Sequence, residues 1–534
     1  TGNKFPKSQR KNNDLFSHSG NPESDWPNVQ KDQLSKLHVA LFQPNAFGLY
    51  DMHGNVEEWT SSTYKKYGND SVSADVMDQP IYVSRGGSHG TALYFLRSAA
   101  RFGAPPFANS MVIGFRVVRE KNGIERQELV QDVVKTTKKT ATTSRERRIL
   151  SEKKAGESYF RFIQYVNIPH NQTKFPYGQH NHDPAITVCP DGSILSIFFS
   201  TWREKDREQG LAFTRLSDPQ NGTWSTPEAF YNIPNRATTG PAFLQSKNGT
   251  LYQWMAVSPW ESNKGTQVYQ RESTDCGRTW SVGYSPQGLN MFGGHSPAET
   301  ALELSDGVLL LPTDDDGKEP EPKDEPRRQK LSGQTSRFCL SSDGGQTWTN
   351  PAGTIRGHHG AFVELHNGSI WGIGRDDGLV GKDGLLRMAQ GLTNDRGNSF
   401  SISATMFPDI HSGQRMVALR LQEGPILVLS FANGKRGVPS VIETRYGKEI
   451  FGLFAAVSFD EASTFAIVRL VSDDSRTSHD VQSTDGHIFQ MNQTHAEPMG
   501  YISAIQDQKS GMIHAITSRQ HYQFNYAWLM AGKG

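Results

Sequence analysis

Two histidines separated by one residue, His180 and His182, are the first side chains that could do chemistry, in the stretch YGQHNHDPAI. Residues two apart in an extended strand point to the same face, so both imidazoles would lie on one side of a strand. A zinc site needs at least a third protein ligand. Asp183, or the distant His295 or His358, could supply one, but no compact spacing joins them. The alternatives are a packing pair, in which His180 braces His182, and a pair of substituted catalytic positions.

The composition of the 534-residue chain is typical of a soluble, turn-rich β protein, with 51 Gly, 27 Pro, 10% aromatic and 35% hydrophobic residues. A net charge of +1 gives no overall field for nucleic acid, so we expect no nucleic-acid partner. No apolar run approaches the roughly 20 residues that cross a bilayer, so we expect no membrane span.

The cysteines indicate little about redox state. Cys189, Cys276 and Cys339 are three in number, far apart, and include no CxxC pair. An odd, sparse set argues against a disulfide scaffold and against a zinc–cysteine site.

The chain divides by composition into an N-terminal domain (1–120), a charged, Thr-rich linker (121–158) and a long C-terminal domain (159–534). From residue 159 onward, short apolar strands alternate with turns that contain Gly, Asp and Asn, which is typical of all-β domains.

The C-terminal domain contains a repeated frame, S/T-x-D-x-(G)-x-T/S-W/F. Copies recur about every 50 to 70 residues, the size of one four-stranded propeller blade, so the repeat predicts a β-propeller. In each copy Asp and Gly would cap a tight hairpin turn with the aromatic residue beneath it, a structural role away from catalysis. The four clear copies are Ser273–Trp280, Ser341–Trp348, Thr393–Phe400 and Ser458–Phe465, and Leu216–Trp224 is a degenerate fifth.

A first family resemblance covers residues 43–119. The stretches QPNAFGLYDMHGNVEEWTSS, SRGGSHG, RSAARF and IGFRVVRE resemble the formylglycine-generating, sulfatase-modifying domain, a smaller α+β fold of C-type-lectin-like type. That family oxidises a substrate cysteine with two cysteines of its own, which align here with Thr91 and Leu96. Since a thiol-dependent oxidation cannot proceed without thiols, we expect a catalytically inactive module. The resemblance also implies a structural calcium at Asn55 and Glu58, with a plain turn as the alternative.

A second resemblance, to the sialidase-like Asp-box (BNR) propellers, covers residues 159–534 and implies a mainly β, six-bladed propeller. His182 occupies the position of the arginine that grips the substrate carboxylate in sialidases. The stretch STWREKDREQG supplies a second arginine, Arg203, and an acid/base, Asp206. Glu204 and Glu208 are rival acids.

The remaining site positions follow in order. In GHHGAFVELHNGSIWGIGR, His359 stands at the glutamate that serves the nucleophile, and Arg375 at an arginine. Tyr501 in EPMGYISAIQDQ matches the nucleophilic tyrosine. The third arginine is either Arg415 or Arg445. His180 and two residues of the closing strand region, Arg519 and His521, complete the expected substrate-binding set.

These substitutions leave three functions open. The first is a retaining exo-glycosidase related to sialidases that acts on a terminal acidic sugar (sialic-acid-like, uronic or sulfated), in which His359 acts as base for Tyr501. The second is a polysaccharide lyase that cleaves uronate chains with histidine, tyrosine and arginine. The third is a glycan-binding protein without chemistry. We expect no cofactor for catalysis, and the family resemblance suggests a secreted or periplasmic bacterial protein.

Overall fold

The computed structural model describes residues 39–40, 43–64, 80–88, 96–106, 108, 113–118, 156–167, 176–202, 204, 209–259, 266–289, 297, 300–315, 334–411, 413–432, 442–483 and 487–531. Strands dominate this part of the chain, and its one named helix is the short α3 (Tyr526–Met530). No helix in these ranges has the length and apolar character that a membrane crossing needs.

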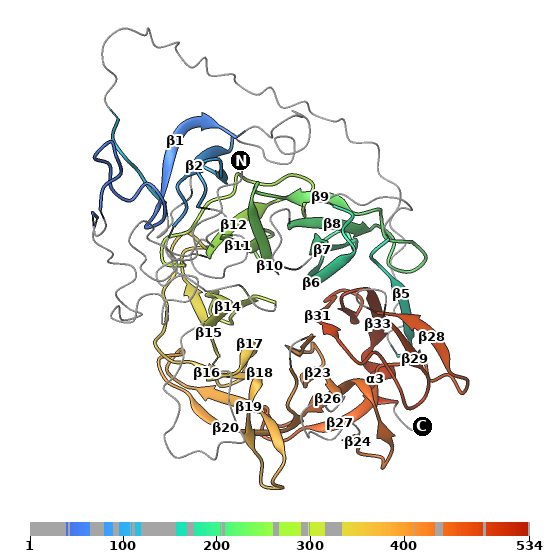
Figure 1. The fold of residues 1–534 in the computed structure, drawn as a ribbon. Helices are drawn as coiled ribbons and strands as arrows, with labels where there is room; N and C mark the ends of the chain where they lie inside the picture. The colour runs from blue at the N-terminus through green and yellow to red at the C-terminus, as the bar shows by residue number, and fades with distance from the viewer. Residues whose placement is uncertain are drawn as a thin grey trace.

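The N-terminal unit contains one mixed sheet in the order β3-β2-β1-β4 (Figure 1). β1 runs antiparallel to β2 and parallel to β4. The helices expected of an α+β fold are not among the residues described here. The strands are β1 (Glu57–Thr63), β2 (Tyr82–Arg85), β3 (Phe102–Ala104) and β4 (Ile113–Gly114).

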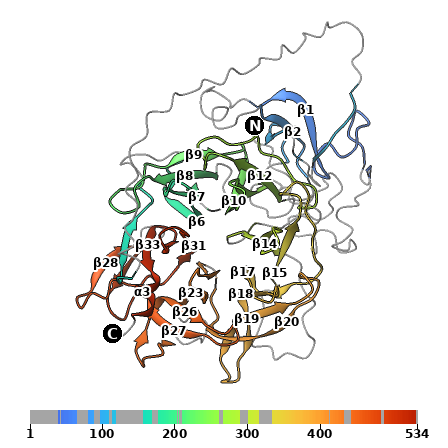
Figure 2. The same ribbon diagram turned by 180° about the vertical axis from the view of Figure 1, so that it is seen from behind.

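Six sheets of three or four strands follow one another around a common centre, as seen from both sides in Figures 1 and 2. The first two comprise β6 (His180–Val188), β7 (Ile194–Thr201), β8 (Gly210–Leu216) and β9 (Glu228–Tyr231), and then β10 (Arg236–Gln245), β11 (Leu251–Pro259) and β12 (Gln267–Ser273). The next two comprise β13 (Leu302–Glu303), β14 (Leu309–Asp315), β15 (Thr335–Ser341) and β16 (Ile355–Arg356), and then β17 (His358–Glu364), β18 (Ile370–Val380), β19 (Leu386–Thr393) and β20 (Ser401–Pro408).

The fifth sheet is formed by β22 (Val417–Arg420), β23 (Ile426–Ala432), β26 (Gly452–Ser458) and β27 (Ala466–Leu470). The sixth has the order β31-β32-β33-β5, with β31 (Ser503–Gln506), β32 (Met512–Ile516), β33 (Gln520–Asn525) and β5 (Phe160–Gln164). Because β5 precedes the first sheet in the chain and pairs with the last strand, its pairing closes the ring.

Three two-stranded ladders accompany these sheets. They are β21 (Gln414–Arg415) with β30 (Gly500–Tyr501), β24 (Ile442–Glu443) with β25 (Glu449–Ile450), and β28 (His479–Gln482) with β29 (Ile488–Met491). One of them, β24–β25, is inserted between β23 and β26 of the fifth sheet.

The core lies between the sheets. The second strands β7 and β23 are buried along their whole length, which is expected of strands that are covered on both faces. Their sequences, ILSIFFST and ILVLSFA, are accordingly near-continuous apolar runs.

The four repeated turns share one hydrogen-bond pattern, and each begins at the last residue of the third strand of its sheet. Asp275 accepts bonds from the hydroxyls of Ser273 (2.8 Å) and Thr279 (2.6 Å), and Ser273 Oγ accepts the backbone N–H of Gly277. The same bonds recur around Asp343, Asp395 and Asp460. The carboxylates of all four aspartates accept hydrogen bonds within their own turns, which fits a structural role.

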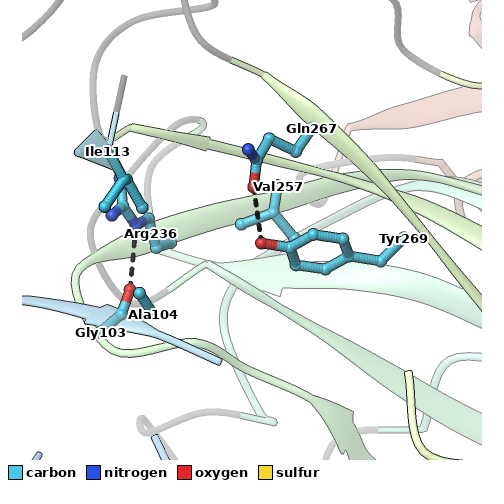
Figure 3. A pocket seen from close by; sticks show the side chains of 7 residues that line it. All are labelled: Gly103, Ala104, Ile113, Arg236, Val257, Gln267 and Tyr269. Atoms are coloured by element: carbon cyan, nitrogen blue, oxygen red, sulfur yellow. Dashed lines mark hydrogen bonds between the residues drawn. The ribbon is translucent and has the colours of Figure 1, made fainter. Parts of the chain in front are cut away.

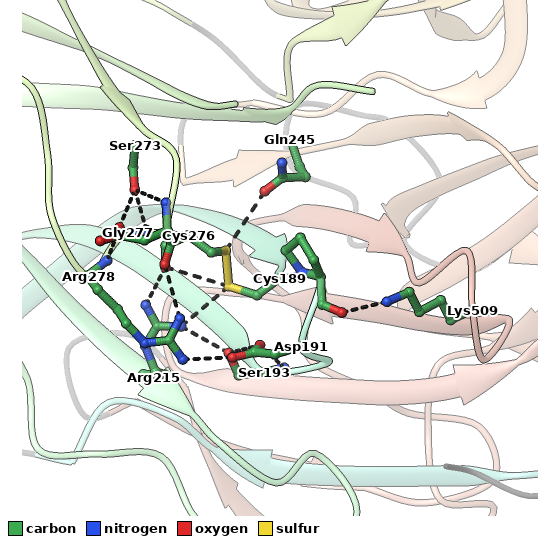
Figure 4. A network of polar contacts seen from close by, with 12 residues as sticks. Cys189, Asp191, Ser193, Arg215, Gln245, Ser273, Cys276, Gly277, Arg278 and Lys509 are labelled. Carbon is green, nitrogen blue, oxygen red and sulfur yellow. Dashed lines mark hydrogen bonds and ion pairs between the residues drawn. A yellow bond between two sulfur atoms is a disulfide. The ribbon is translucent and has the colours of Figure 1, made fainter. Parts of the chain in front are cut away.

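The cysteine count argued against a disulfide scaffold, but one pair is bonded. Cys189, after β6, is bonded to Cys276, in the turn after β12, with Cα atoms 5.7 Å apart (Figure 4). Count and spacing could not reveal this pair, because the two residues are brought together by neighbouring sheets. Around the bond, Arg215 donates to the carbonyl of Cys276 (2.6 Å). Cys339 is buried and is not part of the disulfide.

The N-terminal unit packs on the second sheet through a buried ion pair. Glu57 in β1 accepts two bonds from the guanidinium of Arg236 in β10, at 3.1 and 2.6 Å, and the hydroxyl of Ser84 donates to the same carboxylate. Arg236 also donates to the carbonyl of Gly103, at the edge of a small pocket lined by both units (Figure 3). Because residues of both units line this pocket, it is part of the contact between them. The charges of Glu57 and Arg236 satisfy each other there.

Candidate functional site

Tyr501 is the residue around which the site is built. It lies in β30, which pairs in parallel with β21, so that Arg415 is directly beside Tyr501 in the ladder. The Arg415 guanidinium lies 4.5 Å from the centroid of the Tyr501 ring, and the tyrosine side chain remains partly exposed. This ladder therefore presents a phenol and a cation together.

Arg375 contacts the hydroxyl of Tyr501. It comes from β18, where it is paired in register with His358 of β17. Its Nη2 donates to Tyr501 Oη at 2.8 Å, and its Nη1 donates to the carbonyl of Gln414. The guanidinium is thus held against the β21–β30 ladder, where it polarises the phenol.

His359 contacts the same hydroxyl. Its Nε2 lies 3.1 Å from Tyr501 Oη. The residue sits at a register shift near the start of β17 and has φ +52°, a left-handed backbone that non-glycine residues rarely adopt. Bulges and strained backbone of this kind cluster at functional sites, since they aim a side chain away from the regular pleat.

Asp314, at the end of β14, supports His359. One carboxylate oxygen, Oδ1, accepts the backbone N–H of His359 (2.6 Å), and the other, Oδ2, lies 2.7 Å from its Nδ1. Oδ2 also lies 3.0 Å from Nε2 of His358. Asp314 is 1% exposed, so these bonds form away from solvent.

The first histidine pair, His180 and His182, also packs near Tyr501. The His182 ring centroid is 3.9 Å from that of Tyr501, and its Nδ1 bonds to Ser518 Oγ at 2.6 Å. His180 packs 5.4 Å from His182, consistent with the shared strand face. Asp183 has φ +56° at the register shift of β6 and forms a 2.6 Å ion pair with Arg415. β6 and β17 therefore use the same local device to place site residues.

The environment keeps the phenol and both imidazoles neutral. Burial raises the pKa of Tyr501, although Arg375 and Arg415 work to lower it. Burial lowers the pKa of His182 well below its usual value, with further lowering by His180 and the two arginines. Burial likewise lowers the pKa of His359 well below its usual value, against an opposing effect of Asp314.

Asp314 is the charged partner in this group. Burial works to raise the pKa of its carboxyl, but His358 and His359 outweigh burial and hold the pKa well below its usual range. A neutral His359 beside an ionised Asp314 is the protonation state of a general base.

Asp314, His358 and His359 are also a group that could hold a metal ion, since their ligand atoms lie within 4.8 Å of one another. Bonds of 2.0–2.1 Å to a tetrahedral zinc separate ligand atoms by about 3.3 Å. The 2.7 and 3.0 Å separations from Asp314 to the two imidazoles are shorter and match charge-assisted hydrogen bonds. We therefore treat the three residues as a hydrogen-bonded cluster. His180, His182 and Asp183 do not make up a metal group among the described residues either.

Two predicted binding residues lie elsewhere. Arg445 is exposed in the turn between β24 and β25, where its guanidinium packs on Tyr446, so of the two candidates Arg415 is the arginine at the site. His521 is fully buried between sheets, where it bonds to Trp224 and His514. The sequence of a strand does not show which of its side chains lie between two sheets and which reach the site.

The structure describes only some of the other predicted site residues. Arg519 is half-buried in the β32–β33 turn beside Tyr165, next to Ser518. Glu204 is exposed. Arg203, Asp206, Glu208 and His295 lie outside the described residues.

The calcium prediction at Asn55 and Glu58 stays a prediction. Both carboxylate oxygens of Glu58 accept bonds from Arg116, at 2.6 to 3.0 Å, so an ion would have to compete with this pair. Leu96, at one of the aligned cysteine positions, is fully buried.

Sequence reasoning missed Asp314 and Ser518 and mentioned Asp183 only as a metal ligand. A usable signal existed for Asp314, because three aspartates follow the apolar run GVLLLPT at the end of a strand. Ser518 is a short polar residue in a hairpin turn, and no sequence pattern distinguishes it.

Comparison with known families places both parts of the chain. Residues 192–531, more than half of the chain, match the BNR repeat-like domain. This chain belongs to the BNR repeat-like family. The N-terminal part, residues 1–121, matches the sulfatase-modifying factor enzyme 1-like domain. Over 84 residues it is 39% identical to the inactive C-alpha-formylglycine-generating enzyme 2 of Mus musculus, a match that covers 15% of this chain and 24% of that relative.

Several solved structures resemble this BNR repeat-like protein. A Dyadobacter fermentans DSM 18053 protein of unknown function aligns with a TM-score of 0.46 and 16% identity, over 68% of this chain and 99% of that one. The NanB sialidase of Streptococcus pneumoniae aligns with a TM-score of 0.47 and 11% identity, over 68% and 71%. The Trypanosoma rangeli sialidase aligns with a TM-score of 0.42 and 12% identity, over 70% and 61%.

Proposed function

We propose that this protein is a glycan-degrading enzyme with a six-bladed propeller, acting as a retaining exo-glycosidase on a terminal acidic sugar. The observation that carries the proposal is the hydroxyl of Tyr501, held between Nε2 of His359 and the donor Nη2 of Arg375. A phenol placed between a base and a cation is suited to lose its proton as it attacks.

The proposed first step forms a bond between Tyr501 Oη and the anomeric carbon while the phenol proton passes to His359 Nε2. The bond from that carbon to the leaving oxygen breaks, and Asp206 protonates this oxygen. Water then attacks the same carbon and gives a proton to Asp206. Tyr501 leaves as the phenol, taking its proton back from His359, so the configuration is retained.

The acidic substrate is supported by the charges around Tyr501. The guanidinium of Arg375 lies against the phenol oxygen, and Arg415 lies over the ring with its charge shared with Asp183. A neutral nucleophile suits a sugar whose anomeric carbon bears a carboxylate, because that charge repels an anion. The raised pKa of Tyr501 is consistent with this role. Arg203, His182 and His180 are the further proposed contacts to the sugar.

The second candidate is a lyase acting on uronate chains, and it is favoured by the contact between His182 and Tyr501. A neutral His182 could remove the proton next to the carboxylate while Tyr501 protonates the leaving oxygen, with Arg375 neutralising the carboxylate. Such a reaction needs no pair of carboxylic acids. Its product is unsaturated and absorbs in the ultraviolet, whereas a hydrolase product does not.

The test is a panel of sialosides, sulfated sugars and uronate oligosaccharides, read by released sugar and by ultraviolet absorbance. Tyr501→Phe removes one oxygen and should lower kcat by at least about 10³-fold, with an unchanged melting temperature. Full activity in this variant would rule out the proposed site. If no member of the panel is turned over but some bind, the protein is a glycan-binding module.

We also propose a secreted or periplasmic location. The Cys189–Cys276 disulfide supports it, since such bonds persist in oxidising compartments.

A further inference from the structure

The buried carboxylate of Asp314 lies behind His359, on the side away from Tyr501. Its two oxygens divide their contacts, Oδ1 with the backbone N–H of His359 and Oδ2 with the ring Nδ1. The same residue therefore holds both the backbone and the imidazole of His359. No feature of the sialidase resemblance predicted a residue in this place.

An ionised carboxylate can only accept hydrogen bonds. Nδ1 of His359 must therefore carry a proton in order to bond to Asp314 at 2.7 Å. In a neutral imidazole the other nitrogen is then an acceptor, and this nitrogen, Nε2, faces the Tyr501 hydroxyl at 3.1 Å. The contacts define one continuous chain, from Tyr501 Oη–H to Nε2 and from Nδ1–H to the carboxylate.

We propose that Asp314 is the positioning residue of a Tyr501–His359–Asp314 relay, which fixes His359 in the one tautomer that can take the tyrosine proton. The inference rests on the proposed function, because it assigns a role to the base of that reaction. When the proton moves, His359 becomes an imidazolium, and the carboxylate 2.7 Å away stabilises its charge. The relay thus replaces the carboxylate that serves the tyrosine in sialidases with an imidazole and a carboxylate in series.

The left-handed backbone of His359 supports this assignment. At φ +52° the backbone N–H points to Asp314 Oδ1, where it is held at 2.6 Å. A conformation of this kind persists only where the surroundings impose it. Asp314 is thus part of what aims the imidazole at Tyr501.

Asp314→Asn is the direct test. The amide keeps the shape but can donate to Nδ1, which would move the ring proton to Nε2 and remove the acceptor. We expect kcat to fall by about 10³- to 10⁴-fold, with KM changed by less than about tenfold. Glu57→Gln is the matched control: it also removes a buried, paired carboxylate, but at the contact with the N-terminal unit, and kcat should be unchanged.

The pH profile separates positioning from mere stability. Removing the carboxylate makes the imidazolium less favourable, so any residual activity of Asp314→Asn should persist to lower pH than that of the wild type. A fold defect would not move this acid limb. The groups that face His359 and set the limb are Asp314, His358, Arg375, Arg415 and Tyr501.

A second measurement does not depend on turnover. Nitrogen NMR of labelled histidines in folded Tyr501→Phe protein should show His359 with its proton on Nδ1, and a proton on Nε2 would overturn the proposal. Loss of wild-type activity on chelation, restored by zinc, would also overturn it, since Asp314 would then be a metal ligand. If Tyr501→Phe is inactive while Asp314→Asn keeps full kcat, the relay is wrong and the glycosidase proposal stands. Full activity of Tyr501→Phe overturns both.

Discussion

At the scale of single residues, the site depends on neutral groups held among charged ones. Two imidazoles and a phenol stay uncharged through burial, while Arg415 pairs with Asp183 and the Asp314 carboxylate contacts two histidines. An enzyme that must transfer a proton near neutrality needs this state, because a base that is already protonated cannot accept.

The lowered pKa of His359 predicts the acid side of the activity profile. A free histidine titrates near 6.5, and burial moves His359 well below that value. Since the neutral ring is the active form, kcat should remain on its plateau as pH falls through 6.5 and decline only at lower pH. A profile measured at saturating substrate checks this. A decline centred at or above 6.5 would show that His359 is not the base, provided that circular dichroism shows the fold intact at each pH.

The residues that sequence reasoning found at the site are those with a local frame. Tyr501, Arg375 and His359 each lie in a stretch whose pattern could be matched in order, and the structure brings Arg375 and His359 within hydrogen-bond distance of the Tyr501 hydroxyl. Asp314 and Ser518 contact His359 and His182 from other sheets. No local sequence pattern predicts a contact between residues of different sheets. The local sequence does not distinguish Arg415 from Arg445, and only the fold shows that Arg415 lies at Tyr501.

At the scale of elements, register shifts at the starts of β6 and β17 do the positioning, since each carries a left-handed residue: Asp183 beside His182 in β6, and His359 itself in β17. The sheets themselves were predictable, because the repeated turn marks the end of the third strand in sheet after sheet. Pairing of Cys189 with Cys276 was not, because it depends on how two adjacent sheets pack.

The disulfide between the first two sheets should contribute to the stability of the fold. It joins residues 87 apart, and the loss of such a cross-link typically costs about 2–5 kcal/mol of folding free energy. Cys189→Ala/Cys276→Ala should therefore melt at lower temperature than the wild type. Reductant should lower the melting temperature of the wild type and leave that of the double variant unchanged.

Cys339→Ala is the control for the lost thiols, since it removes a buried cysteine that is not part of the disulfide. This variant should keep the full response to reductant. An equal response in the double variant would contradict the pairing.

At the scale of the whole molecule, the N-terminal unit is fastened to the ring by a pair of charges out of contact with water. The side chains of Arg236 and Glu57 are 6% and 0% exposed. Removal of one partner of such a pair is strongly destabilising, by about 3–5 kcal/mol, because the other charge stays buried and unpaired.

Arg236→Ala should therefore loosen the N-terminal unit while the ring remains folded. Limited proteolysis should release this unit faster than in the wild type, and calorimetry should separate one transition into two. An exposed pair, Arg278 with Asp191, offers the control, since Arg278→Ala should change neither result. A single unshifted transition in Arg236→Ala would show that the pair does not couple the units.

The pairing of β5 with β33 has a consequence for biosynthesis. Tyr159 and Asn525, which bond at the end of this ladder, are 366 residues apart. While the chain is being made, β5 emerges from the ribosome early and finds its partner only when nearly every other strand has been synthesised. Until then the sixth sheet is incomplete, and an open strand edge is exposed to other chains. We expect this seam to be where nascent chains most need protection from aggregation.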